Sequence, residues 1–232
     1  MEFKIIKQEP NSNARITEIK LAHGKVETPC FIPVGTKASV KTISSKQLNE
    51  LNADMILVNT YHLQPFVDVI EKAGGINKFI SYNKPVMTDS GGFQAFSLGF
   101  GMLHGVGKIG SYFPENNQLK KSNKSYVKID NFGVDFISPY TGEKIKLTPE
   151  ISIKLQEKIK ADIILAFDEC TSPFSDYEYT KKALKRTHNW AEECIDVHKT
   201  QQALFGIVQG GMFENLRKES AEFITKLNFV NY

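Results

Sequence analysis

The stretch Pro85-Val-Met-Thr-Asp-Ser-Gly-Gly-Phe-Gln94 decides the fold more than any other part of the chain. Its apolar beginning is typical of a short strand through Thr88, which predicts that Asp89 lies at the carboxyl end of that strand. Parallel α/β sheets and barrels keep their chemistry at this end. The Gly91-Gly92 pair allows the backbone to approach a planar ligand, on which the Phe93 ring is placed to stack. The alternative is a polar turn between a strand and a helix.

The same arrangement recurs along the chain, which favours a functional site over an isolated turn. Five short apolar runs each stop at polar or glycine residues, at residues 30–34, 55–58, 85–87, 163–167 and 204–208. Continuous apolar runs indicate strands that are buried on both faces, hence a parallel sheet. Helical patterns lie between these runs, so the sequence predicts repeated β-α alternation.

The helical segments carry recognisable start signals. Ser44 and Gln47 form a capping box, with Ile43 and Leu48 placed as a hydrophobic staple. Thr148-Pro149 places proline at a first helical position. Each later helix is predicted to bury one face: Ile151, Leu155 and Ile159; then Ala183, Thr187, Trp190 and Cys194 between residues 176 and 198; then Leu216, Ser220, Phe223 and Leu227 from Glu214 onward.

Five βα units fit either a doubly wound sheet or a (β/α)₈ TIM barrel. Polar residues at all five strand ends, with no Gly-x-Gly-x-x-Gly after the first strand, favour the barrel. Residues 1–29 are interpreted as a small antiparallel preface. Residues from about 100 to 147 are interpreted as an insertion on the barrel rim, with hairpin signals at Asn131-Phe-Gly133 and Tyr140-Thr-Gly-Glu143. We therefore treat residues 1–232 as one partial barrel domain.

The composition is that of an ordinary globular protein, with 41% hydrophobic and 24% charged residues. No apolar run reaches the roughly 18 residues of a membrane span, and no membrane partner is expected. The three cysteines form neither a disulfide framework nor a metal motif, which favours a reducing cytoplasm. Neither the histidines nor the cysteines have ligand spacing, so no metal site is predicted.

The net charge of +3 permits an RNA partner without requiring one. Basic residues gather in two groups, and each group is interpreted as a solvated face in preference to a set of phosphate contacts. The groups are Lys120, Lys121, Lys124 and Lys128, and Lys181, Lys182, Lys185 and Arg186.

Asp89 and Asp168 are the two carboxylates expected at strand ends. Displacement at a sugar carbon with retained configuration needs a carboxylate nucleophile and a second acid/base group, but these two need not be that pair. An aspartate can instead clamp the N1–H and exocyclic amino donors of guanine, while an amide such as Gln209 donates to O6. On successive strands, Asp168 and Gln209 would lie side by side. The alternative is that Asp168 caps a turn and Gln209 is a hydrogen-bonded structural amide.

Two further candidates are weaker. Gln209-Gly-Gly211 is interpreted as opening a helix, where backbone N–H groups bind phosphate, although the lysine of a P-loop is lacking. His62 is interpreted as a hydrogen-bonded support residue in preference to a base.

Four motifs, in this order, strongly resemble the tRNA-guanine transglycosylases (queuine tRNA-ribosyltransferases). They are Asn59-Thr-Tyr-His-Leu63, Thr88-Asp-Ser-Gly-Gly-Phe-Gln94, Ala166-Phe-Asp-Glu-Cys-Thr171 and Ala203-Leu-Phe-Gly-Ile-Val-Gln-Gly-Gly211. The resemblance extends from about residue 10 to the last residue. The Gly91-Gly92 and Glu169-Cys170 pairs resemble the bacterial and eukaryotic branch of the family more than the archaeal one, and we take the chain as the bacterial type.

The resemblance implies an enzyme that exchanges guanine at the wobble position of tRNA for a 7-deazaguanine. In bacteria this base is usually 7-aminomethyl-7-deazaguanine, a queuosine precursor, and the reaction passes through a covalent ribosyl-aspartate. The resemblance assigns Asp89 as the general acid/base, and Ser90, Gly91, Gly92 and Phe93 as the lining of the base pocket. Asp168 and Gln209 match the base-reading positions. It also implies that the full-length enzyme is a homodimer.

By the same resemblance, Tyr232 lies where a sixth barrel strand would begin. The nucleophilic aspartate, much of the RNA-binding surface and the Cys/His ligands of a Zn²⁺ ion would follow residue 232, so no cofactor is expected within this chain. Five strands of an eight-stranded barrel leave an open edge, and we expect the chain alone to be aggregation-prone and inactive in base exchange. The alternative functions are a non-catalytic tRNA-binding or scaffolding partner of the same fold, and an unrelated barrel enzyme acting on a phosphorylated sugar.

Overall fold

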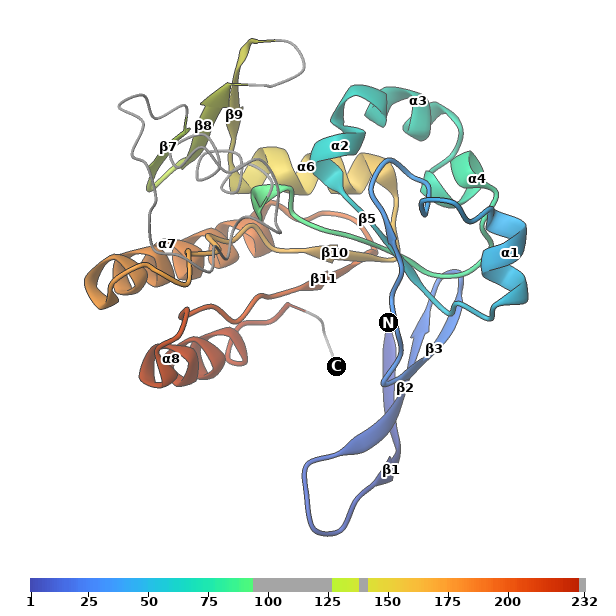
Figure 1. The fold of residues 1–232 in the computed structure, drawn as a ribbon, viewed down its shortest axis with the longest axis horizontal. Coiled ribbons are helices and arrows are strands. Elements are labelled where there is room, and N and C mark those ends of the chain that lie inside the picture. Colours follow the sequence, from blue (N-terminus) through green and yellow to red (C-terminus); the bar gives the residue numbers. More distant parts are fainter. Residues whose placement is uncertain (94–126, 138–141, 230–232) are drawn as a thin grey trace.

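A five-stranded parallel sheet is the centre of the α/β fold (Figure 1). The computed structural model describes residues 1–93, 127–137 and 142–229. The strand order is β11–β10–β6–β5–β4, so each strand pairs with the parallel strand that precedes it in the chain. All five predicted strands are present but shorter than the apolar runs: β4 (Val34–Gly35), β5 (Ile56–Val58), β6 (Val86–Thr88), β10 (Ile163–Leu165) and β11 (Ala203–Phe205).

The two faces of this sheet differ in burial. Alternate residues on one face are buried beneath the helices: Ile56, Val58, Val86, Ile164 and Leu204. On the other face, Leu57, Met87, Leu165 and Phe205 stay partly exposed, whereas Ile163 and Ala203 are buried in an apolar cluster with Val26. The prediction of strands buried on both faces therefore holds only in part for this second face, because the described strands form an open sheet. The closed eight-stranded barrel stays a prediction.

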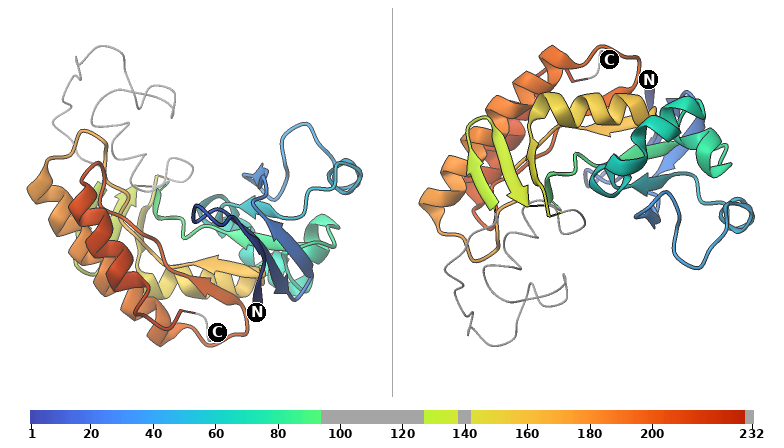
Figure 2. Two further views of the ribbon diagram at one scale, coloured as in Figure 1. Left: turned by 90° about the horizontal axis from the view of Figure 1, so that it is seen from below. Right: turned by 90° about the horizontal axis from the view of Figure 1, so that it is seen from above.

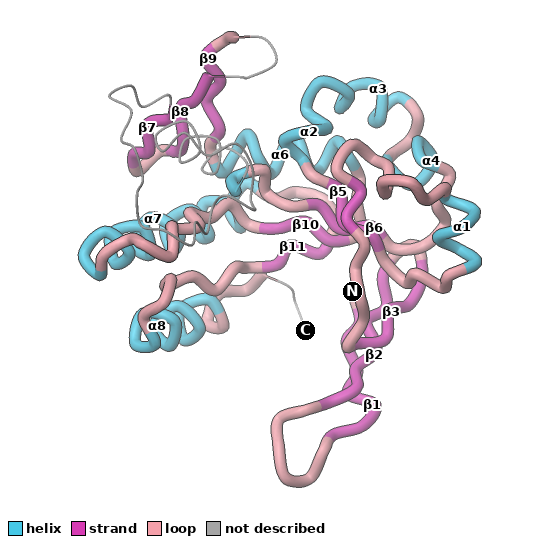
Figure 3. Tube along the Cα trace, viewed as in Figure 1, coloured by secondary structure: helices cyan, strands magenta, loops and turns pink. Residues whose placement is uncertain are grey.

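Helices alternate with the strands along the chain (Figure 3). Helices α6, α7 and α8 lie on the same side of β10 and β11 (Figure 2). The connection from β4 to β5 contains α1 (Ser45–Glu50), and the connection from β5 to β6 contains α2 (Thr60–Leu63), η1 (Gln64–Phe66), α3 (Val67–Lys72) and α4 (Ile76–Ile80). The later helices are α6 (Pro149–Ile159), α7 (Tyr177–Val197) and α8 (Glu214–Ile224).

The helix start signals are confirmed. Ser44 and Gln47 form a reciprocal capping box at α1, and Thr148 caps α6 directly before Pro149. The predicted inner face of α7 is also confirmed, since Ala183, Thr187, Trp190 and Cys194 are all buried.

The inner face of α6 differs from the predicted apolar stripe. Ile159 is buried, whereas Ile151 and Leu155 are only partly so. Two polar residues, Ser152 and Gln156, have no exposed surface. They are tolerated there because both are hydrogen-bonded to strand ends. On α8 Leu216 and Ser220 are buried and Phe223 partly so, but the helix ends at Ile224, before the predicted Leu227.

Two small antiparallel sheets extend from opposite ends of the central sheet (Figure 1). The first contains β1 (Glu2–Gln8), β2 (Arg15–Leu21) and β3 (Gly24–Thr28), where the antiparallel preface is predicted. The second contains β7 (Val127–Asp130), β8 (Gly133–Ile137) and β9 (Lys144–Leu147). Asn131-Phe-Gly133 connects β7 to β8 as the hairpin signal predicts. Residues 100–126 and 138–141 of the predicted rim insertion lie outside the described residues, and with them Tyr140 and Thr141 of the second hairpin signal.

The second sheet is fixed to the core by side chains from the main fold. Trp190 on α7 donates from Nε1 to the Asn131 carbonyl over 2.8 Å. Phe136 and Leu147 pack in the same apolar cluster as Phe167. Among the described helices, none is both long and apolar enough to cross a membrane.

Candidate active site

Three of the predicted site residues converge at the carboxyl ends of the strands. Gln209, which follows β11, donates from Nε2 to Oδ2 of Asp168, which follows β10, over 2.7 Å. From the next strand, β6, the hydroxyl of Ser90 donates to Asp168 Oδ1 over 3.3 Å. Side chains from three adjacent strands therefore meet at one carboxylate, and Asp168 and Gln209 remain partly exposed.

The environment of Asp168 perturbs its titration. Burial raises the pKa of this carboxyl to about 6, the hydrogen bonds from Gln209 and Ser90 oppose the rise, and the nearby Asp89 carboxylate adds to it. Asp168 therefore still carries its charge at neutral pH and is an acceptor for two donors of a ligand.

Asp89 is held by a different set of donors. Asn59 donates from Nδ2 to Oδ2 of Asp89 over 2.5 Å, and the Thr60 backbone N–H donates to Oδ1 over 2.8 Å. The Thr60 hydroxyl donates to the Asp89 carbonyl over 2.5 Å. The Gly91 N–H closes a local turn onto Oδ1 at 3.2 Å. Asp89 is thereby fixed in orientation while part of its surface stays exposed.

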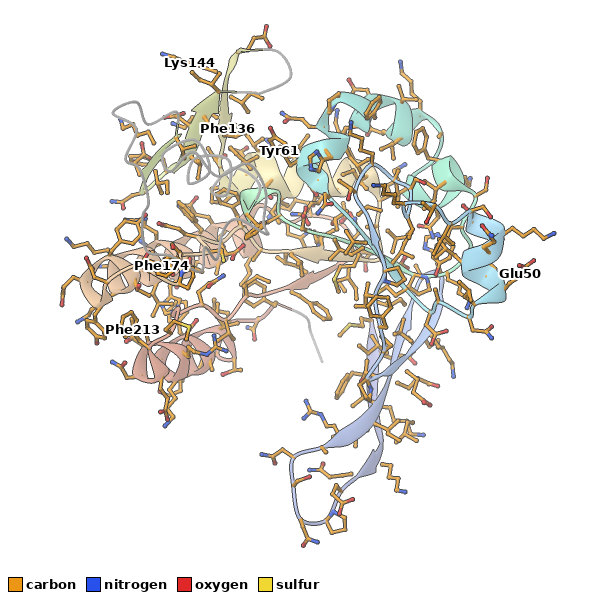
Figure 4. All side chains as sticks on the ribbon, viewed as in Figure 1. Glu50, Tyr61, Phe136, Lys144, Phe174 and Phe213 are labelled. Atoms are coloured by element: carbon orange, nitrogen blue, oxygen red, sulfur yellow. The ribbon has the colours of Figure 1, made fainter. Side chains whose placement is uncertain are left out.

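The glycine pair after Ser90 lies in tightly packed surroundings. Gly91 and Gly92 are buried, and Gly91 has a φ of +77°. A Cβ atom on Gly91 would lie 3.4 Å from the Tyr61 backbone nitrogen. Tyr61 in turn contacts Phe136 of β8, with ring centroids 5.7 Å apart, so the second small sheet supports this turn (Figure 4). Phe93 is partly exposed, as a stacking role requires.

The Gln209-Gly-Gly211 segment has a steric function. Gly210 has a φ of +131°, and a Cβ atom there would lie 2.6 Å from the Arg217 backbone nitrogen. The interpretation that this segment opens a helix is wrong, because α8 begins at Glu214. The carboxylate of Glu214 in the first turn of α8 also repels an anion, so the start of α8 does not support a phosphate site.

A buried ion pair beneath the site was missed by sequence reasoning. Arg186 donates from Nε to Oε2 of Glu169 over 2.6 Å and from a terminal nitrogen to Oε1 over 3.0 Å. The Tyr179 hydroxyl donates to Oε1 over 2.7 Å, and the Glu169 N–H bonds to Thr187 Oγ1 over 3.0 Å. Arg186 is therefore not part of a solvated face, because it neutralises a carboxylate that is 2% exposed.

The lysines of the two basic groups are either exposed or outside the described residues. Lys128, Lys181, Lys182 and Lys185 are exposed, as a solvated face requires. Lys120, Lys121 and Lys124 lie outside the described residues.

A hydroxyl on α8 fixes the backbone beside Gln209. The Gln209 N–H donates to Ser220 Oγ over 3.0 Å, and Ser220 is completely buried. His188 on α7 lies 3.4 Å from the same oxygen and stacks on Phe223 with ring centroids 4.1 Å apart. The sequence pattern placed Ser220 correctly on the inner face but gave no indication of its partner.

The surroundings of His62 and of the three cysteines shift their titration toward the uncharged form. Burial lowers the pKa of His62, with the Asp89 charge opposing it, and its ring lies against Tyr61 with centroids 5.1 Å apart. Burial raises the pKa of Cys30, Cys170 and Cys194, which disfavours the thiolate that zinc binds. Among the described residues, no three His, Cys, Asp or Glu side chains gather as a metal site, so they do not fit a zinc ion.

A cavity of about 570 Å³ lies at the opposite, amino-terminal end of the strands. The buried Asp162 carboxylate in its wall accepts hydrogen bonds from the His23 N–H at 2.9 Å and the Val86 N–H at 3.0 Å. Gln202 donates to the Ala161 carbonyl over 2.8 Å. These bonds fix the N-terminal sheet and α6 to the base of the central sheet, which is a structural role.

The fold and site together define an α/β protein with a parallel sheet whose strand ends bring an aspartate, a glutamine and a serine into contact. The family model for queuine tRNA-ribosyltransferase matches residues 10–232. The chain belongs to the queuine tRNA-ribosyltransferase family.

Individual relatives support this assignment. A protein of Archaeoglobus fulgidus named "Putative queuine tRNA-ribosyltransferase" is 45% identical over 94% of this chain and 56% of its own length. The queuine tRNA-ribosyltransferase of Bacillus licheniformis is 40% identical over 100% of this chain and 55% of its own length. The queuine tRNA-ribosyltransferase of Staphylococcus aureus is 42% identical over 99% of this chain and 55% of its own length. The chain thus spans 55–56% of the length of these relatives. The bacterial type within the family stays a prediction.

Proposed function

We propose that this chain supplies the base-reading part of a tRNA-guanine transglycosylase, which replaces guanine at the wobble position of tRNA with a 7-deazaguanine. The observation that carries the proposal is the contact of Gln209 and Ser90 with the carboxylate of Asp168. A carboxylate has about four lone-pair sites and a glutamine amide has two N–H donors. Asp168 therefore retains acceptor capacity for a ligand, and Gln209 retains a second hydrogen.

The chemistry of these groups matches the edge of guanine. The N1–H and 2-amino donors of guanine fit the charged Asp168 carboxylate, and the second Nε2 hydrogen of Gln209 fits O6. Charge-assisted hydrogen bonds of this kind are the stronger ones. Phe93 stacks on the purine face and the Gly91-Gly92 backbone lies against it. A 7-deazaguanine has the same edge, so one pocket accepts both the leaving and the incoming base.

Asp89 is proposed as the general acid/base of the exchange. Its carboxylate is oriented by Asn59 and Thr60 and keeps an exposed part that can reach a substrate. The ribosyl-aspartate intermediate requires a second carboxylate as nucleophile. The five described βα units would form one part of a (β/α)₈ barrel, with tRNA as the partner and the cytoplasm as the compartment. A homodimer and a zinc ion belong to this proposal as properties of the full-length enzyme.

Replacement of Asp168 tests the proposal against a non-catalytic tRNA-binding role. Asp168→Asn keeps the size of the side chain but loses the charge and gains a donor that faces the donors of guanine. We expect guanine binding, measured by calorimetry, to be lost while tRNA binding persists. Unchanged guanine affinity in the variant would contradict the base-reading role. An absence of guanine binding in the unaltered chain would contradict it as well.

A further inference from the structure

The strands that carry the two aspartates separate as they approach the site. β6 and β10 share one registered pair, Ile163 opposite Met87. Further along β10, both backbone groups of Leu165 bond to a side chain: its N–H and its carbonyl each lie 2.9 Å from the amide of Gln156. Asp89 and Asp168 follow these separated ends. The width of the separation therefore determines the space between the two carboxylates.

Gln156 of α6 fills this separation and has no exposed surface. Its Oε1 accepts from the Leu165 N–H over 2.9 Å and from the Thr88 hydroxyl over 2.9 Å. Its Nε2 donates to the Leu165 carbonyl over 2.9 Å and to Ser152 Oγ over 3.2 Å. Both acceptor and both donor positions of the amide are used. One side chain thus joins the end of β6 to the end of β10, in place of ladder hydrogen bonds.

Ser152, one helical turn before Gln156, extends the connection to the site itself. Its hydroxyl donates to the Ser90 carbonyl over 2.7 Å, and Ser152 also has no exposed surface. The Ser90 side chain contacts Asp168 and accepts from the Gly92 N–H over 3.3 Å. Ser152 therefore fixes the peptide that orients both Ser90, which contacts Asp168, and the turn after Asp89.

We propose that Gln156 and Ser152 are positioning residues that set the spacing of the Asp89 and Asp168 strand ends, and with it the fit of the purine between them. This inference rests on the proposed base-reading function. Buried polar groups that are fully bonded specify one arrangement, because any alternative leaves a donor or acceptor without a partner. Neither residue touches the base, so their effect passes through Ser90, Thr88 and Leu165.

Ser152→Ala tests this inference, with Ser45→Ala as its matched control. Ser45 on α1 also donates to a backbone carbonyl, that of Ile80, over the same 2.7 Å, but away from the site. We expect Ser152→Ala to weaken guanine affinity roughly 10- to 100-fold, as small displacements of oriented groups do. Amide hydrogen exchange at Gly91 and Gly92 should become faster. Ser45→Ala should change neither measurement.

Equal guanine affinity and equal glycine exchange in Ser152→Ala and the unaltered chain would overturn the inference. If the unaltered chain binds no guanine, the proposed function fails, and hydrogen exchange at Gly91 and Gly92 alone decides whether Ser152 holds the turn. Faster exchange then supports the positioning role and unchanged exchange overturns it.

A double-mutant cycle separates a shared network from two independent supports. Gln156→Glu keeps the size and the acceptors of the side chain but replaces the Nε2 donor with an oxygen that repels the Leu165 carbonyl. Since Ser152 and Gln156 act on the same strand ends, the combined variant should lose less binding free energy than the sum of the single losses. Strictly additive losses would show that the two residues act separately and would overturn their joint role in setting the spacing of the strand ends.

Discussion

Gln209 contacts Asp168 through its side chain, Nε2 to Oδ2 at 2.7 Å, while its backbone N–H is held by Ser220 at 3.0 Å. Gln209 is thus held both at its side chain and at its backbone. The orientation of its side-chain amide relative to the Asp168 carboxylate therefore does not depend on a bound ligand. This hydrogen bond opposes the effect of burial on the pKa of Asp168. The charge state of Asp168, the proposed base-reading carboxylate, therefore depends on a side chain from the neighbouring strand.

Replacing Gln209 should change the titration of Asp168. Gln209→Met keeps the side-chain length but removes the donor, so the pKa of Asp168 should rise above its value of about 6. Carboxyl-carbon NMR titration of both proteins measures this directly. Gln201→Met, at an exposed position, is the control. A lower or unchanged pKa in Gln209→Met would show that the amide does not stabilise the charged carboxylate.

Guanine binding should depend on pH through the same group. The folded-state pKa of Asp168 is raised to about 6, and binding needs the ionised carboxylate. Affinity should therefore be constant above pH 7 and fall by about tenfold for each pH unit below the pKa. Calorimetry between pH 5 and pH 8 checks this. Affinity that increases toward acidic pH would contradict the assignment, because it would indicate that the protonated acid binds the base.

The stability of the fold should depend strongly on the ion pair between the buried Glu169 and Arg186. Arg186→Met removes both hydrogen bonds to a carboxylate that is 2% exposed and leaves its charge unpaired. We expect a loss of about 3–5 kcal/mol in the free energy of unfolding, measured by urea denaturation. Lys185→Met, at the exposed preceding position, should change it by less than about 0.5 kcal/mol. Equal effects of the two replacements would show that the ion pair does not stabilise the fold.

Replacement of Gly210 by alanine should destabilise the fold much more than replacement of Gly142 by alanine. Both have positive φ, +131° and +72°, but a Cβ atom on Gly210 would lie 2.6 Å from the Arg217 nitrogen, whereas one on Gly142 would meet nothing within 4 Å. The clash with helix backbone at Gly210 adds to the conformational strain that both alanine variants share. Thermal melting should therefore show a much larger loss for Gly210→Ala. Similar melting temperatures for the two variants would contradict this packing.

Much of the site was predictable from the sequence because its residues follow short apolar strands. Asp168 and Gln209 each stand directly after a run that forms a strand, and parallel strands bring such residues together. Their contact confirms the predicted proximity. Their roles in reading a base remain proposals.

The supporting residues were not predictable in the same way. Arg186, Gln156 and Ser152 lie on helices whose patterns indicate a solvated or an apolar face. Their partners lie up to 68 residues away in the chain, as for Gln156 and Thr88. Helical periodicity reports which side of a helix is buried, but it does not report which polar group a buried side chain meets. The continuous apolar runs likewise did not predict that Leu57, Met87, Leu165 and Phe205 on the second face of the sheet would stay partly exposed.

The most direct measurement is the affinity of this chain for guanine, 7-deazaguanine, hypoxanthine and adenine, determined by calorimetry at pH 7.5. If Asp168 clamps N1–H and the 2-amino group, guanine and 7-deazaguanine should bind alike, because they share this edge. Hypoxanthine lacks the amino group and should bind roughly 10- to 100-fold more weakly, and adenine should not bind. Equal affinity for guanine and hypoxanthine, or preference for adenine, would contradict the account.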